Sequence, residues 1–231
     1  MTDLRVEDDP AGAAAERLAE AVRGGGHVAL AGGSTPAAAY ERVAGMGLDW
    51  SGATLWFGDE RCVPAEHEHS NFRMARETLL DRIEGSPPGV HRMAGELGPD
   101  EGAADYELQL REAFGAGLPE LDLVILGLGP DAHTASLFPG RPEIDERERL
   151  ATGVAEPGME PLVPRVTLTL PVLNAAREVL FLVSGESKAE AVARAFGDGA
   201  PSREAPASLV APVPGRLTVM LDAAASGRLQ P

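Results

Sequence analysis

The pattern of apolar and polar positions alternates along the chain between two periods, one typical of strands and one typical of helices. Almost uninterrupted apolar runs predict buried strands at residues 27–31, 53–57, 121–126, 178–183 and 217–221. Apolar residues spaced three or four positions apart predict helices at residues 10–23, 36–46, 71–83, 101–114 and 187–196. Shorter strands are expected at residues 150–155 and 166–170. This alternation predicts an α/β fold with an open, mostly parallel sheet and helices on both faces, a Rossmann-like three-layer arrangement.

The composition is that of a globular protein, and the acidic net charge limits which molecules the protein can bind. A length of 231 residues with 44% hydrophobic and 24% charged positions suits one domain spanning residues 1–231. The net charge of −16 argues against nucleic acid and anionic membrane surfaces as partners, and it means that an anionic substrate needs a local basic pocket. The single cysteine, the acidic N-terminal segment and the lack of an apolar run near the ~20 residues of a membrane helix together predict a cytoplasmic protein.

Segment 121–139 carries the strongest chemical signal in the sequence. The predicted strand at residues 121–126 ends in a turn rich in glycine and proline, and Asp131 and His133 follow it at once. Ligands of open α/β sheets bind beyond the carboxyl ends of the strands, so a titratable pair in this position predicts a site. A carboxylate beside an imidazole fixes its tautomer and raises its basicity, which suits a general base that acts on water.

Other interpretations of this segment stay open from the residues alone. His133 could be a structural histidine or one ligand of a metal. The only other paired histidines, His67 and His69, lie in a polar loop, so a metal site is the less favoured prediction. Residues 127–132 also fit a loose dinucleotide-binding fingerprint, but two nearby prolines leave no good helix start for a pyrophosphate.

The segment Gly32-Gly33-Ser34-Thr35-Pro36 joins a predicted strand to a predicted helix. Its glycines allow close backbone approach, Ser34 or Thr35 can cap the helix, and Pro36 suits the first helical position. Exposed N–H groups at a helix N-terminus attract anions, so a phosphate fits here. An ordinary strand-to-helix turn explains the same residues equally well, and the spacing of a Walker A loop is absent.

Charged residues after the strand at residues 53–57 are a weaker candidate site. Asp59, Glu60 and Arg61 stand in a row beyond this strand, where a solvated loop is the simpler interpretation. Cys62 follows them, with no histidine nearby in the sequence, and it suits packing better than nucleophilic attack.

Two basic residues are isolated in their surroundings. Arg165 is the only charge in residues 161–171, and Lys188 falls in the first turn of a predicted helix, where a cation opposes the helix dipole. The cost of such a lysine is only ~0.3–1 kcal/mol, so a solvated surface residue is the simpler alternative. A phosphate shared with the helix end would remove that cost, and departures from local rules tend to mark functional sites.

Taken in order, these motifs resemble the 6-phosphogluconolactonase family of the glucosamine-6-phosphate isomerase superfamily. The matching motifs are GGSTP at 32–36, GDER at 58–61, SNF at 70–72, GLGPDAHTASLFP at 127–139, RVT at 165–167 and GESK at 185–188. The resemblance covers essentially the whole chain, and its most specific part surrounds His133. It implies hydrolysis of 6-phospho-D-glucono-1,5-lactone to 6-phospho-D-gluconate in the oxidative pentose phosphate pathway, without a cofactor or a metal.

The resemblance also implies roles for individual residues. His133 is expected to be the general base that activates water, and Asp131 is expected to orient it or to lie beside the sugar. Asp59 is expected at the edge of the pocket. The groups expected to hold the phosphate and to stabilise developing negative charge are Gly32, Gly33, Ser34, Thr35, Arg61, Arg165 and Lys188.

One departure and two rival functions accompany the resemblance. The family usually has glycine between the aspartate and the histidine, where this chain has Ala132; the difference is small unless that position needs a positive φ. A related deaminase family has a glutamate five residues beyond the histidine and an aromatic residue after its Asp-Glu pair, where this chain has Phe138 and Arg61. A sugar-phosphate sensor needs an output module, for which the sequence offers no segment. The oligomeric state is left open.

Overall fold

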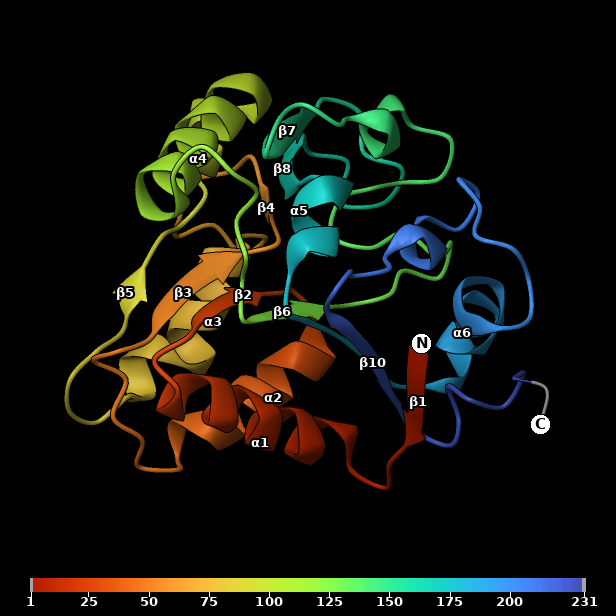
Figure 1. Ribbon diagram of the computed structural model, residues 1–231, viewed down its shortest axis with the longest axis horizontal. Coiled ribbons are helices and arrows are strands. Elements are labelled where there is room, and N and C mark those ends of the chain that lie inside the picture. The colour runs from red at the N-terminus through yellow and green to blue at the C-terminus, as the bar shows by residue number, and fades with distance from the viewer. Residues whose placement is uncertain (1, 230–231) are drawn as a thin grey trace.

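A seven-stranded parallel sheet forms the centre of the molecule, in a computed structural model that describes residues 2–229 (Figure 1). Its strand order is β1-β10-β9-β6-β2-β3-β5, and every neighbouring pair is parallel. The strands are β1 (Thr2–Val6), β2 (His27–Leu30), β3 (Thr54–Phe57), β5 (Gly89–Val90), β6 (Leu123–Leu126), β9 (Glu178–Val183) and β10 (Arg216–Leu221). Every residue of β6 and β9 is buried, as their apolar runs predict. The predicted mostly parallel sheet is confirmed.

Helices cover the sheet on both faces, as the alternation of elements predicts. They are α1 (Pro10–Arg23), α2 (Ser34–Ala44), α3 (Asn71–Thr78), α4 (Pro99–Phe114), α5 (Leu170–Ala175) and α6 (Ala189–Phe196). Short 3-10 turns are η1 (Leu80–Arg82), η2 (Gly95–Leu97), η3 (Pro142–Asp145), η4 (Glu186–Lys188) and η5 (Pro206–Leu209). The α1 and α2 helices lie side by side below the sheet in Figure 1. No helix within residues 2–229 is long and apolar enough to cross a membrane.

A small antiparallel sheet lies above the main one and is the largest difference from the expected architecture. Its order is β4-β8-β7, with β4 (Asp59–Arg61), β8 (Arg165–Leu168) and β7 (Ala151–Val154). The strands β7 and β8 correspond to the predicted short strands, but β4 consists of three charged residues that favoured a solvated loop. Helix α4 packs across β7 and β8 (Figure 1). The second sheet places Arg61 directly opposite Arg165.

The order of the strands creates a crevice beside β2. From β2 the chain passes through α2 to β3 on one side, whereas β6 lies on the other side of β2. The loops that follow β2 and β6 therefore leave the sheet in opposite directions. Open parallel sheets bind ligands at such a switch point, outside the carboxyl ends of the strands.

Several predicted boundaries are wrong in ways that concern the candidate site. Helix α2 begins at Ser34 with Gly33 as its N-cap, so Ser34 and Thr35 lie inside the first turn and do not cap it. Lys188 ends the 3-10 turn η4 and is the N-cap of α6, so it precedes the helix in whose first turn it was expected. The strands β1 and β5 and the helix α5 were not predicted, because they are short and lack a clear period.

Candidate active site

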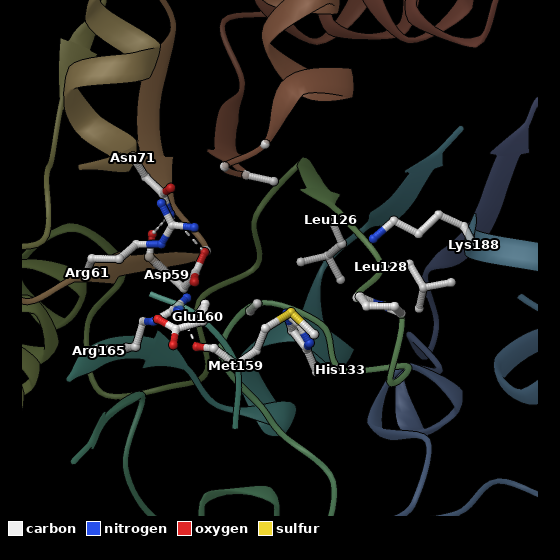
Figure 2. A pocket seen from close by; sticks show the side chains of 18 residues that line it. Asp59, Arg61, Asn71, Leu126, Leu128, His133, Met159, Glu160, Arg165 and Lys188 are labelled. Carbon is white, nitrogen blue, oxygen red and sulfur yellow. Dashed lines mark hydrogen bonds between the residues drawn. The ribbon is translucent and has the colours of Figure 1, made fainter. Parts of the chain in front are cut away.

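A cavity of about 230 Å³ opens at the carboxyl ends of β2, β3 and β6, at the switch point of the sheet. Figure 2 shows the side chains that line it. The predicted residues that line the cavity are Gly32, Gly33, Asp59, Arg61, His133, Arg165 and Lys188. Ser34, Thr35 and Asp131 are not part of its lining. The structure therefore brings most of the predicted site residues to one place, although they come from five separate segments.

His133 and Asp131 form a hydrogen-bonded pair at the turn after β6. The distance between His133 Nδ1 and Asp131 Oδ1 is 2.6 Å, and the same oxygen accepts the backbone N–H of His133 at 3.1 Å. Burial raises the pKa of Asp131, but the hydrogen bond and charge of His133 outweigh it, so this pKa is lowered overall. The ionised carboxylate can only accept, so the Nδ1–H group points to Asp131, and in a neutral imidazole the lone pair is then on Nε2. Asp131 therefore contacts the imidazole.

Hydrogen bonds within the turn hold the backbone that carries His133. Gly129 N donates to the carbonyl oxygen of His133 at 2.9 Å, and Ala132 N donates to the carbonyl oxygen of Gly129 at 3.0 Å. A Cβ atom at position 129 would collide with the ring of His133. Thr134 Oγ1 donates to the carbonyl oxygen of Gly127 at 3.0 Å. Glycine is needed at position 129 for space.

Ala132 lies in the left-handed region with φ 67°, fully buried between Asp131 and His133. Its carbonyl oxygen accepts a hydrogen bond from Ala207 N at 3.1 Å, which holds the peptide in this orientation. A left-handed conformation costs a residue with a Cβ roughly 1–2 kcal/mol. The alanine that departs from the family pattern therefore occupies a position with positive φ, and the loop carries this strain beside His133.

We expect Ala132→Val to lower the free energy of unfolding by about 2–4 kcal/mol, because a β-branched residue is a severe outlier at positive φ and the buried site has no room for it. Ala132→Gly is the matched control. It relieves strain of ~1–2 kcal/mol. Two effects oppose this gain. The variant loses a buried methyl group worth ~0.8 kcal/mol, and glycine loses more backbone entropy on folding than alanine does, which costs ~0.5–1 kcal/mol. We expect the glycine variant to unfold within about 1 kcal/mol of wild type in urea; a valine variant of equal stability would contradict the positive φ.

Arg61 and Arg165 face each other across β4 and β8 at one end of the cavity (Figure 2). The Nε atoms of both are buried and, within residues 2–229, have no hydrogen-bond partner. Arg165 is 3% exposed and donates from Nη2 to the carbonyl oxygens of Met159 at 3.2 Å and Pro161 at 3.1 Å. Burial lowers the pKa of Arg165, while the charge of Asp59 raises it. Like charges in opposing positions are destabilising, so this arrangement favours a bound anion.

Asp59 lies beside these arginines and is held from two sides. Its Oδ2 atom accepts from Ser136 Oγ at 2.6 Å, and its Oδ1 atom accepts from Asn71 Nδ2 at 3.1 Å. At 7% exposure the carboxylate is a wall of the cavity and not a group at its solvent edge. The interpretation of residues 59–61 as a solvated loop is wrong, because hydrogen bonds from distant segments compensate for the burial of these charges.

Glu60 has a structural role beside the cavity. Its carboxylate accepts the backbone N–H groups of Asn71 at 2.7 Å and Phe72 at 2.8 Å, at the start of α3, and the hydroxyl of Ser70 at 3.0 Å. Burial raises the pKa of Glu60, and these hydrogen bonds oppose the rise. An acid at a helix N-terminus stabilises the helix, so Glu60 fixes α3 and with it Asn71 at the cavity.

Lys188 lies at the other end of the cavity from Arg61 and Arg165 (Figure 2). Burial lowers the pKa of Lys188, and the charge of Asp131 opposes this. The glycine loop before α2 lines the same cavity, and Gly33 there has φ 108°, which glycine adopts without strain. A Cβ at position 32 would collide with Asn71. The loop thus presents backbone without side chains to a ligand.

Sequence reasoning missed several residues of the cavity and its walls. They are Asn71, Leu126, Leu128, Ala135, Ser136, Met159 and Glu160. Asn71 stands in the motif SNF, which is a local signal, but no local signal marks Met159 or Glu160, which reach the cavity only through the fold. Burial and the charge of Glu60 raise the pKa of Cys62 to about 11, so this thiol is protonated at neutral pH, as its interpretation as a packing residue predicts.

Comparisons with known proteins agree with this arrangement. A family model described as glucosamine-6-phosphate isomerases/6-phosphogluconolactonase matches residues 5–219. The chain is 40% identical to a 6-phosphogluconolactonase of Synechocystis sp., over 93% of this chain and 90% of that protein. It is 42% identical to a 6-phosphogluconolactonase of Homo sapiens, over 91% of this chain and 80% of that protein. The solved structure of 6-phosphogluconolactonase from Trypanosoma brucei superposes with a TM-score of 0.86 at 28% identity, covering 100% of this chain and 99% of that one.

Proposed function

The chain belongs to the glucosamine-6-phosphate isomerase/6-phosphogluconolactonase family, and we propose that its cavity hydrolyses 6-phospho-D-glucono-1,5-lactone with His133 as the general base. The enzyme is a carboxylic ester hydrolase of the 6-phosphogluconolactonase type. The observation that carries the residue assignment is the pair His133–Asp131, which leaves one imidazole nitrogen free to accept a proton at the cavity.

The reaction follows from this pair. His133 Nε2 removes a proton from water, and the water oxygen bonds to C1 of the lactone, whose carbonyl oxygen becomes an oxyanion. Asp131 stabilises the imidazolium that forms. The bond between C1 and the ring oxygen then breaks, and the ring oxygen takes the proton from Nε2. The C1 carbonyl re-forms as this bond breaks, and the new carboxyl group releases its proton to water to give 6-phospho-D-gluconate. The sequence of steps uses water and protein side chains alone.

The charges along the cavity suggest which end holds the phosphate. Arg61 and Arg165 share their end with two carboxylates, Asp59 and Glu160, which would repel a phosphate dianion. Lys188 offers positive charge at the opposite end, where no carboxylate within residues 2–229 lines the cavity. The N-terminus of α2 adds backbone N–H donors from the glycine loop, which packs against Asn71. We therefore assign the phosphate to Lys188 and the glycine loop Gly32–Thr35, and the developing oxyanion at C1 to the arginine pair.

The rival function within the same family is deamination of an amino sugar phosphate. The curated relatives that match at about 40% identity over most of the chain are lactonases, so deamination is not favoured. A cytoplasmic site of action is part of the proposal, supported by a composition with one cysteine.

The test of the function is whether the purified protein accelerates loss of the lactone beyond its spontaneous hydrolysis. Acid release followed at constant pH measures both rates in one vessel. We expect a rate proportional to protein concentration and saturable by substrate. A protein that binds 6-phosphogluconate without accelerating hydrolysis would instead be a sugar-phosphate sensor.

We expect Lys188→Ala to raise KM for the phosphorylated lactone by about 10–100-fold, because a charge-assisted hydrogen bond of ~1.5–3 kcal/mol to the phosphate is lost. Glucono-1,5-lactone, which lacks the phosphate, is the matched control substrate, and its kcat/KM should change at least several-fold less. Steady-state rates with both substrates measure the difference. If both substrates lose the same factor, Lys188 acts on the reacting end and the phosphate assignment is wrong.

A further inference from the structure

Phe138 is fully buried against the reacting end of the cavity and is not explained by the reaction steps above. The centre of its ring lies 4.5 Å from that of the His133 imidazole, at an angle of 41°. The guanidinium carbon of Arg165 lies 5.6 Å from the centre of the same ring. One aromatic side chain therefore contacts both the base and a cation assigned to the developing charge.

The ring of Phe138 is also held in place by the chain at Gly158. A Cβ at position 158 would lie only 3.1 Å from Phe138, so the chain at Gly158 packs closely on the ring. The following residue, Met159, lines the cavity, and its carbonyl oxygen accepts from Arg165 at 3.2 Å. Phe138 thus stands at the junction of three parts of the site: the turn that carries His133, the strand that carries Arg165, and the loop that carries Met159.

The contacts of Phe138 with His133 and with Arg165 both restrict the orientation of the neighbouring group. Asp131 restrains Nδ1 of the imidazole, but one hydrogen bond leaves the ring free to tilt about it; a flat neighbour at 4.5 Å limits that tilt. A cation over an aromatic face within about 6 Å is attracted to it, more strongly where water is excluded, as at Arg165. Misplacement of reacting groups by about 1 Å can reduce rates by 10²-fold.

We propose that Phe138 is a positioning residue that fixes the imidazole of His133 and the guanidinium of Arg165 relative to each other. This inference rests on the proposed function, because it assigns His133 and Arg165 to one reacting carbonyl. Its effect falls on kcat, since Phe138 does not line the cavity and packs on Arg165, at the end opposite Lys188.

Phe138→Leu keeps an apolar side chain but removes the flat ring, and Phe181→Leu is the matched control. Phe181 of β9 is equally buried and packs on Phe196 at 4.9 Å, outside the cavity lining. We expect kcat to fall about 10-fold in Phe138→Leu with KM within about twofold, and both constants to stay near wild type in Phe181→Leu. Phe138→Met serves the same comparison if the leucine variant does not fold.

Two further measurements separate positioning from a loss of packing. The effect of Phe138→Leu should shrink in an Arg165→Met background, because the two side chains act as a unit. The downfield NMR signal of the His133 Nδ1 proton should be sharp in wild type and Phe181→Leu and broadened in Phe138→Leu. Equal kcat values in the two leucine variants, with an unchanged Nδ1 signal, would overturn the proposal. If the wild-type protein does not hydrolyse the lactone, the proposed function is overturned. The His133 Nδ1 signal in the two leucine variants then still tests whether Phe138 positions the imidazole.

Discussion

Replacing His133 by alanine is expected to lower kcat by about 10²–10⁴-fold, the usual contribution of a positioned general base. In the proposed reaction Nε2 accepts the proton of water, while Nδ1 is hydrogen-bonded to Asp131 at 2.6 Å. Without the imidazole, the remaining acceleration comes only from binding and from the charges at the arginine end. The measurement is kcat at saturating lactone, after subtraction of the spontaneous rate.

His67→Ala is the control for this experiment, because His67 is an exposed histidine outside the cavity lining. We expect it to keep wild-type rates. His133 is partly exposed at 16%, so His133→Ala should leave the free energy of unfolding within about 1 kcal/mol of wild type. Wild-type turnover in a folded His133→Ala variant would rule out the general-base assignment.

Arg165→Met is expected to lower kcat by about 10²-fold and to leave the protein folded. Removal of one group that stabilises an oxyanion commonly costs 10²–10³ in kcat. In the free protein, however, Arg165 is buried opposite another arginine and its Nε has no partner within the described residues. Replacing both partners of a buried ion pair by apolar side chains is often neutral or stabilising, but removing one partner is destabilising. Arg165→Met relieves the repulsion from Arg61, but it also removes the hydrogen bonds to the carbonyl oxygens of Met159 and Pro161 and the positive charge beside Asp59. We therefore expect the free energy of unfolding to fall by about 1–3 kcal/mol.

Arg73→Met provides the matched control for this substitution. Arg73 of α3 forms an exposed pair with Glu77 at 2.7 Å and does not line the cavity. Exposed pairs contribute only ~0–1 kcal/mol, so both rate and stability should stay near wild type. Urea unfolding and steady-state kinetics measure the two quantities. An Arg165→Met variant with unchanged kcat and a raised KM would move Arg165 from the oxyanion to the phosphate.

The chemical core of the site could be predicted from sequence because its parts are local. Asp131 and His133 are two residues apart, and the glycine-rich turn after a buried strand places them at the carboxyl edge of the sheet. The same holds for the glycine loop at the start of α2. The pattern could not predict the backbone conformation between Asp131 and His133. The positive φ of Ala132 is accompanied by a hydrogen bond from Ala207, which lies far along the chain.

The strand β4 shows where local patterns fail. Three consecutive charges predict exposure, since burying an unpaired charge is costly. Here the partners come from elsewhere: Ser136 donates to Asp59, and the N-terminus of α3 donates to Glu60. Ser136 is far from residues 59–61 in the sequence. A local pattern therefore cannot predict the hydrogen bond that compensates for the burial of Asp59.

The sequence by itself determined the alternation of elements and the acid–imidazole pair, because both depend on residues that are close together in the chain. It also determined the sign of the overall charge, which depends on composition alone. Only the tertiary structure decided that Arg61 and Arg165 oppose each other, that Lys188 lies at the far end of the cavity and that Phe138 contacts both His133 and Arg165. The physical reason is that strand order and strand pairing arise from packing between distant segments. Hydrophobic periodicity records which face of an element is buried, but not against what it is buried.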